Sequence, residues 1–216
     1  MVSTGSLEIE HGDANEGVEL YKQVLLKKIK EHSGIKFWEI AIKTRKELNL
    51  KEIDFVVVTG GKIDLRKNIH KLLKVVSELN IKNLKLVIFG KPNKDTRQYV
   101  EKYASSPSII NVGWISPDTV YNYLAIADLA FFPGTHSVLW EQAVGMGIPC
   151  VFKKWNGIQH VDIGGNCIFI EEGNETEIKE TLKRLINNQG ILNKMKDIAQ
   201  KKGARRFSYS EIAKRA

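Results

Sequence analysis

The sequence is poor in cysteine and proline, and it has no long apolar run. Of its 216 residues, 2 are Cys and 5 are Pro. Cys150 and Cys167 lie in apolar, strand-like segments without the spacing of metal ligands, which argues against both a disulfide framework and a zinc site. No apolar run approaches the roughly 20 residues that span a bilayer, and the first residues lack the apolar core of a signal peptide. We therefore expect a cytoplasmic protein.

The sequence has 33 Lys and Arg against 25 Asp and Glu, which gives a formal net charge of +8. An excess of this kind favours an anionic partner. The basic clusters lack interleaved aromatic residues and a nucleic-acid docking motif, so we expect no nucleic-acid partner. An anionic membrane fits better, because each basic residue near its surface contributes roughly 1 kcal/mol. Peripheral contact with the inner membrane face is thus one interpretation, and a solvated lysine-rich surface is the other.

Apolar runs of strand length alternate with amphipathic helical segments from residue 55 onward. Continuous apolar strands are typical of a parallel sheet that is covered on both faces. The pattern predicts an α/β domain with a doubly wound, Rossmann-like parallel sheet and ligands at the carboxyl ends of its strands. The predicted strands are 55–59, 84–89, 109–112, 127–132, a run after Pro149, and 167–170, and the predicted helices include 69–79, 96–104, 116–124 and 176–186.

We divide the chain into three parts by composition. Residues 1–16 are polar and contain glycine, which predicts a flexible tail. Residues 17–50 form a helical lead-in, with helices expected over Glu19–His32 and Phe37–Leu48. Residues 51–216 make up the sheet domain, which we expect to bind a nucleotide sugar for the reasons below.

Two connections at carboxyl ends of strands carry the features of anion sites. The first, residues 60–68, is rich in glycine and lysine but matches neither a dinucleotide fingerprint nor a Walker loop. In the second, Pro133-Gly134 ends a strand, and Thr135 or Ser137 is expected to cap a helix that ends at Gly147. Free amides at such a helix start favour a phosphate. Because many βα connections contain a glycine and a cap, the second loop alone is a weak indication.

In order and spacing, the segments from about Ala41 to Ala213 resemble the C-terminal, donor-binding domain of GT-B fold glycosyltransferases of the group 1 type. In that family a glycine-arginine turn, followed five positions later by a lysine, binds the donor diphosphate. Gly61-Lys62 and Lys67 stand at those places here, with lysine in the position of the arginine. Lysine offers a point charge without the bidentate fork of arginine.

Two further segments extend the resemblance. Val112-Gly113-Trp114-Ile115 is similar to the strand and turn beside the nucleotide base, although Trp114 also suits a core position. Residues 142–149 resemble the family's Glu-Ala-Met-Ala-x-Gly-x-Pro helix, with Gln142 in place of the glutamate that holds the ribose. A slip of one residue would give that role to Glu141. The family's sugar-contacting glutamate falls at Gly134, which leaves the donor sugar and the stereochemistry open.

The resemblance implies a glycosyltransferase of polysaccharide biosynthesis that moves a sugar from a nucleotide diphosphate, such as a UDP-sugar, to a hydroxyl acceptor. It implies no cofactor and no metal, and it implies an N-terminal domain or companion subunit that this sequence does not contain. The catalytic residues stay unassigned. The alternatives are a sugar-nucleotide epimerase of the same fold and a non-catalytic nucleotide-sugar binding module. The candidate substrate-binding residues are Gly61, Lys62, Lys67, Trp114, Gly134, Thr135, His136, Ser137, Val138, Glu141 and Gln142.

Overall fold

The computed structural model describes residues 36–207. The chain forms two compact units, Met1–Ile40 and Ala41–Ala216. Of the first unit, only the start of helix α2 (Lys36–Glu47) is described. The expected tail, 1–16, and the expected helix Glu19–His32 lie outside the described residues.

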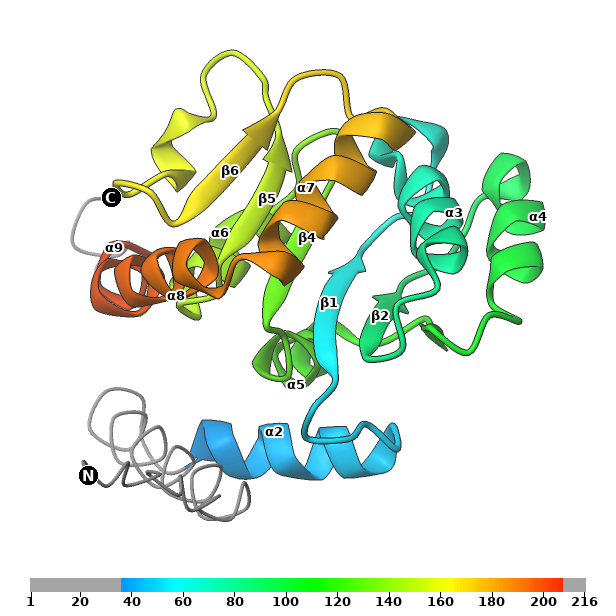
Figure 1. The fold of residues 1–216 in the computed structure, drawn as a ribbon, viewed down its shortest axis with the longest axis horizontal. Helices are drawn as coiled ribbons and strands as arrows, with labels where there is room; N and C mark the ends of the chain where they lie inside the picture. Colours follow the sequence, from blue (N-terminus) through cyan, green and yellow to red (C-terminus); the bar gives the residue numbers. More distant parts are fainter. Residues whose placement is uncertain (1–35, 208–216) are drawn as a thin grey trace, which may run out of the picture. The chain divides into compact units, whose positions relative to one another are not determined.

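Six parallel strands form one sheet in the order β3-β2-β1-β4-β5-β6 (Figure 1). This order confirms the predicted doubly wound sheet. The chain winds outward in one direction from β1 to β3 and in the other from β4 to β6, so the connections after β1 and β4 leave a crevice between them. The strands are β1 (Phe55–Gly60), β2 (Leu84–Phe89), β3 (Ile109–Gly113), β4 (Leu129–Phe132), β5 (Cys150–Lys153) and β6 (Cys167–Ile170).

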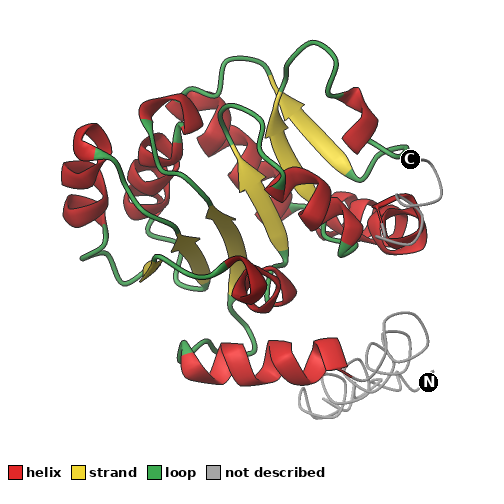
Figure 2. Cartoon of the chain, turned by 180° about the vertical axis from the view of Figure 1, so that it is seen from behind, coloured by secondary structure: helices red, strands yellow, loops and turns green. Residues whose placement is uncertain are grey.

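Each apolar strand supplies side chains to two separate cores, one on each face of the sheet. Successive residues of a strand point to opposite faces, so Val57 packs beneath α3 and α7 while Val56 and Val58 pack beneath α5 and α6. Figures 1 and 2 show these two helix layers from opposite sides. The helices of the domain are α3 (Ile69–Leu79), α4 (Lys94–Tyr103), α5 (Val120–Ala125), α6 (Leu139–Gly145), α7 (Glu175–Asn187), α8 (Gln189–Ile198) and α9 (Ala204–Phe207).

Both cysteines are free and lie side by side in the sheet. Cys150 of β5 pairs in register with Cys167 of β6. The Cys150 thiol donates a hydrogen bond to the carbonyl oxygen of Ile148, and burial raises the pKa of the Cys167 thiol. Both are reduced thiols within apolar strands, as the sequence predicts.

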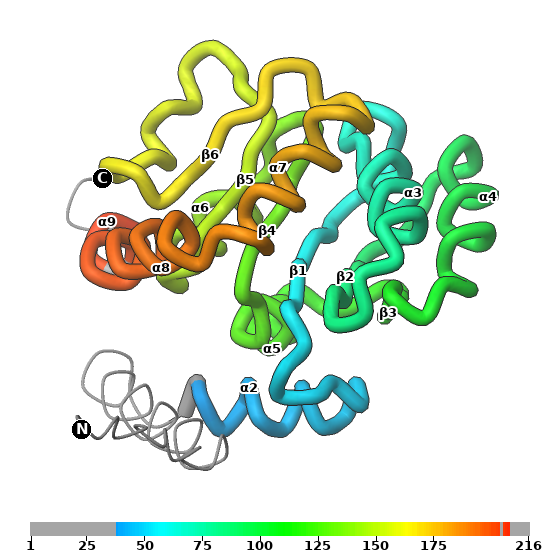
Figure 3. Tube along the Cα trace, viewed as in Figure 1, coloured from blue at the N-terminus to red at the C-terminus, as the bar shows by residue number. Residues whose placement is uncertain are grey.

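Among residues 36–207, no helix has the length and apolar character needed to cross a membrane. The helices between strands are short because each one spans the sheet once before the chain returns to the next strand. Figure 3 follows the chain through these crossovers and shows the connections after β1, β4, β5 and β6 at one edge of the sheet. The candidate site lies at this edge.

Candidate functional site

The connections after β1 and β4 touch each other at the crevice of the sheet. The backbone N–H of Thr135 donates to the carbonyl oxygen of Arg66 at 3.0 Å. A Cβ atom on Gly134 would lie 2.3 Å from that same oxygen and 2.3 Å from the carbonyl carbon of Lys67. Such distances leave no room for a side chain. Glycine at 134 therefore lets the two connections approach to backbone contact, and a glutamate side chain has no space at this position.

The connection after β1 is shaped by its own side chains. Asp64 accepts a hydrogen bond from the backbone N–H of Arg66 and so starts the short 3₁₀ helix η1 (Leu65–Lys67). The Arg66 guanidinium also bonds to the Asp64 carboxylate at 2.8 Å, which lowers the pKa of Asp64. Asn68 has a left-handed backbone (φ 53°), and its amide donates to the carbonyl oxygen of Pro133. This geometry presents Lys67 to the second connection.

Lys67 joins the two connections through its side chain. Its Nζ donates to the carbonyl oxygens of Thr135 at 2.7 Å and His136 at 2.6 Å. Desolvation lowers the pKa of this half-buried ammonium group. Lys62 lies on the same connection and is exposed, after Gly61 with its left-handed φ of 101°. One cation is thus fixed in the crevice and the other is open to solvent.

The expected side-chain cap of α6 is a wrong prediction. The helix begins at Leu139, Val138 occupies the N-cap position, and no side chain caps the helix. The carbonyl oxygen of Ser137 accepts from the N–H of Trp140 instead. Since Lys67 draws the preceding carbonyl groups toward itself, the loop is held from outside and needs no local cap. Within residues 36–207, no acceptor takes the backbone N–H of Ser137 or Val138.

Glu141 and Gln142 point away from each other, as neighbours on a helix should. The Glu141 Oε1 atom lies 2.7 Å from Nε2 of His136 and 3.0 Å from Nε2 of His160. The Gln142 amide donates to the Tyr121 hydroxyl at 3.2 Å. The remaining oxygens, Glu141 Oε2 and Gln142 Oε1, are buried and have no hydrogen-bond partner in the described part of the chain. Two acceptors at this site therefore lack donors.

Trp114 stands apart from these residues. It follows β3, which is separated from β1 by β2, and its side chain is 70% exposed. This exposure excludes the alternative of a core aromatic. An exposed indole suits stacking on a nucleotide base, since stacking does not depend on the identity of the base.

Three residues of the site were missed by the sequence analysis. Asn68 offered a signal, because asparagine tolerates the left-handed conformation at a helix entry. The segment from Trp155 to His160 resembles the family's post-strand loop, but neither residue was assigned a role; in the structure, Trp155 Nε1 donates to the carbonyl oxygen of Gly134 at 3.2 Å. Both lie on the connection after β5, and only the folded sheet brings that connection beside the others.

Asp128 lies outside the site, although its segment shares the family resemblance. Its carboxylate accepts the N–H of Val56 at 2.8 Å, at the amino ends of β4 and β1. Burial raises the pKa of this carboxyl group. Its role is to join two strands at the edge opposite to the site.

Residues 36–207 contain no group of three or more His, Cys, Asp or Glu side chains arranged to hold a metal ion. The donors that converge at the crevice are ammonium groups and backbone amides. Such donors bind anionic oxygens rather than cations.

A family model described as "Glycosyl transferases group 1" matches residues 41–202. Similar solved structures include Anabaena HepE in complex with UDP and glucose, with 18% identity, a TM-score of 0.68, and coverage of 82% of this chain and 50% of that one. Another is sucrose-phosphate synthase from Thermosynechococcus elongatus, with 17% identity, a TM-score of 0.66, and coverage of 81% and 46%. A third is WaaG, a glycosyltransferase involved in lipopolysaccharide biosynthesis, with 17% identity, a TM-score of 0.65, and coverage of 81% and 50%. This chain spans about half the length of these structures, and no curated protein sequence matches it.

Proposed function

This chain belongs to the glycosyl transferases group 1, and we propose that it binds the nucleotide-diphosphate sugar donor of a glycosyl transfer. The observation that carries the proposal is the contact of Lys67 with the loop after β4. It fixes a cation in the crevice of a doubly wound sheet, which is where such folds hold their ligands.

The donor diphosphate is proposed to lie between Lys62, Lys67 and the backbone N–H groups of Ser137 and Val138. During transfer, the bond from the anomeric carbon to the phosphate oxygen breaks, a bond to the acceptor oxygen forms, and the proton of the acceptor hydroxyl passes to the departing diphosphate. The two electrons of the broken bond leave with the diphosphate. Fixed cations and amides stabilise this growing charge and therefore lower the barrier. The proposal needs no cofactor and no metal.

The nucleoside is proposed to extend from the diphosphate toward β3. The exposed Trp114 directly follows β3 and suits the base, and Gln142 of α6 suits the ribose. We propose a UDP-sugar as donor, because HepE has been solved with UDP and with UDP-glucose. The likeness to WaaG supports a place in polysaccharide biosynthesis.

We propose that the acceptor hydroxyl is held by a second domain or subunit that faces the carboxyl edge of the sheet. An oriented acceptor supplies several kcal/mol of the rate enhancement, and a closed site excludes water from the sugar. Lys62, Lys67 and the loop after β4 all belong to this domain, so donor binding does not depend on the facing partner.

The test is a titration of the protein with UDP, GDP, ADP and CMP, followed by assays with the matching nucleotide sugars. Preferential binding of one diphosphate is expected, and transfer to an acceptor when the facing domain is supplied. Epimerisation of the sugar would instead assign a same-fold epimerase, and binding without any turnover would assign a binding module. Failure to bind any nucleoside diphosphate would overturn the proposal.

A further inference from the structure

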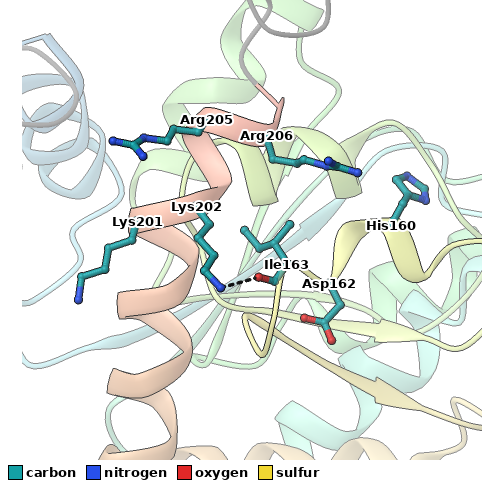
Figure 4. Close-up of a pocket in the computed structure, with 7 residues that line it drawn as sticks. All are labelled: His160, Asp162, Ile163, Lys201, Lys202, Arg205 and Arg206. Atoms are coloured by element: carbon teal, nitrogen blue, oxygen red, sulfur yellow. Dashed lines mark hydrogen bonds between the residues drawn. The ribbon is translucent and has the colours of Figure 1, made fainter. Parts of the chain in front are cut away.

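A basic pocket lies beside His160. Its volume is about 500 Å³, within the range of small-molecule sites. It lies between the connection after β5, which contains the 3₁₀ helix η3 (Gln159–Val161), and the π-helical segment η4 (Ala199–Gly203) with α9. Figure 4 shows the residues that line it, which are His160, Asp162, Ile163, Lys201, Lys202, Arg205 and Arg206.

Glycines shape both walls of this pocket. A Cβ atom on Gly203 would lie 2.1 Å from the carbonyl oxygen of Val144, so η4 packs directly against α6. On the other wall, Gly164 and Gly165 have φ angles of 109° and 106° and form a tight turn. Lys202 closes the gap, because its Nζ donates to the carbonyl oxygen of Ile163 at 3.2 Å. The pocket is therefore built by backbone packing, with charged side chains along its rim.

The charged side chains do not all face the same way. Figure 4 shows Lys202 and Arg206 extending toward the connection after β5, while Lys201 and Arg205 extend away from it. Lys201 is also paired with Asp197. Among the described residues that line the pocket, Asp162 is the carboxylate, and it accepts the backbone N–H groups of Gly164 at 3.0 Å and Gly165 at 2.7 Å. Its charge is thereby partly satisfied, and positive charge dominates the pocket.

We propose that this pocket binds a phosphate group carried by a small molecule or by a lipid. A guanidinium group and an ammonium group together match the oxygens of a phosphate, with a planar fork on one side and a point charge on the other. The pocket exceeds the size of a bare phosphate ion, which leaves room for the group that carries the phosphate. Short π-helical segments such as η4 are also frequent at functional sites.

The pocket is separate from the donor site but connected to it through one carboxylate. His160 faces the pocket, and it shares the Glu141 Oε1 atom with His136 of the loop after β4. A ligand in the pocket therefore lies two side chains away from the donor loop. The proposal does not rest on donor binding, because none of Lys62, Lys67 or Trp114 takes part in it.

The test uses a matched pair of double variants. Lys202→Gln with Arg206→Gln removes the two cations that face the pocket, and Lys201→Gln with Arg205→Gln removes two that point away. Both change the net charge by the same amount. Inorganic phosphate is titrated in the Lys67→Ala background, which removes the cation of the donor crevice, and binding is followed by the imidazole resonances of His160. We expect the pocket pair to weaken binding about tenfold, as the loss of charge-assisted contacts predicts, and the control pair to leave it nearly unchanged.

A second variant is expected to bind phosphate more tightly, which is a result that poor folding cannot produce. Asp162→Asn keeps an oxygen for the two glycine amides but removes the negative charge, so phosphate should bind several-fold more tightly. Vesicles of phosphatidylcholine with and without phosphatidic acid then distinguish the sources of the phosphate. If the Lys202→Gln, Arg206→Gln variant loses binding to the phosphatidic acid vesicles and the control variant does not, the ligand is a lipid headgroup. If it loses binding to free phosphate alone, the ligand is a soluble molecule. Equal losses in both double variants, or no phosphate binding at all, would overturn the proposal.

Discussion

The Nζ atom of Lys67 lies 2.7 Å from the carbonyl oxygen of Thr135, and this contact holds the loop after β4 against the loop after β1. An ammonium group has three N–H donors. Two of them are used by the carbonyl groups of Thr135 and His136, and one remains for a phosphate oxygen. The lysine is therefore held in place by the protein itself, and the proposed binding of a diphosphate requires little reorganisation.

We predict that Lys67→Ala weakens nucleoside diphosphate binding far more than nucleoside binding. A charge-assisted hydrogen bond is worth roughly 1.5 to 3 kcal/mol, or about 10- to 100-fold in affinity. The nucleoside lacks the group that the ammonium contacts. Calorimetry with UDP and uridine measures the two effects, and Lys62→Ala should give the same pattern with a smaller loss.

Lys183→Ala is the matched control for both variants. Lys183 is an exposed lysine of α7, and it lies in the half of that helix that leads away from the carboxyl edge of the sheet. Its removal changes the net charge equally and should leave both affinities unchanged. Equal losses of UDP and uridine in Lys67→Ala would refute the assignment to phosphate.

The sheet and its order of elements were predictable because apolar periodicity is a local property. Strand 84–89 and helix 69–79 have the predicted bounds, since each is a continuous or periodic apolar pattern flanked by polar residues. Lys62, Lys67 and Gly134 were assigned to the site by their spacing within a family pattern, and their binding roles stay a prediction. Such residues sit at fixed offsets from a strand end, and the fold preserves those offsets.

The rest of the site depends on contacts between distant segments. Helix α6 starts without a side-chain cap because Lys67, 68 positions before Thr135, holds the loop carbonyls. His160 meets Glu141 from a connection 19 positions further on. Neither contact leaves a trace in the local sequence, because each is set by how the strands are ordered in the sheet.

The affinity for a nucleoside diphosphate should begin to fall at a lower pH than it would if Lys67 had the pKa of an ordinary lysine. Desolvation lowers the pKa of Lys67 below its usual value, so its amine loses the proton at lower pH in the free protein. Once neutral, it no longer attracts the diphosphate. Stability changes with pH in the opposite direction. Between the lowered pKa of Lys67 in the folded protein and its usual pKa in the unfolded chain, the unfolded state binds more protons, so the free energy of unfolding rises with pH.

Lys67→Arg isolates this effect, because guanidinium stays charged over the whole range. Affinity for UDP is measured from roughly pH 7 to pH 11, around the ordinary lysine pKa. The wild-type protein should lose affinity with rising pH relative to the arginine variant. Parallel curves would show that another group, such as the base itself, controls the pH dependence.

Gln142→Ala should weaken UMP and UDP by the same factor. Gln142 donates to the Tyr121 hydroxyl of α5 and is the residue we propose for the ribose, whereas Glu141 is held between two histidines. A contact with the ribose is common to both nucleotides, so the loss should not depend on the number of phosphates. The measurement is calorimetry with the two nucleotides, and Glu141→Ala is the comparison. If Glu141→Ala weakens UMP and UDP equally and Gln142→Ala does not, Glu141 contacts the ribose in place of Gln142.

Gly134→Ala should both destabilise the protein and weaken diphosphate binding. The added Cβ would lie 2.3 Å from the carbonyl oxygen of Arg66, so the backbone of one connection must move. Overpacking of this kind typically costs about 1 to 3 kcal/mol. Movement of the loop also separates the Thr135 carbonyl from Lys67, which should reduce the affinity for UDP more than that for uridine.

Thr135→Ala is the control for this variant, because Thr135 contacts the first connection through its backbone and the backbone is retained. Its stability should stay within about 0.5 kcal/mol of the wild type in urea unfolding. Gly134→Glu introduces the family's residue at this position. This variant should lose stability as Gly134→Ala does, and its affinity for a nucleotide sugar should not increase. The reason is steric, since a side chain at this position points into the backbone of Arg66 and Lys67. Wild-type stability in Gly134→Ala would show that the two connections are not in backbone contact, and the role of Lys67 as their link would then fail with it.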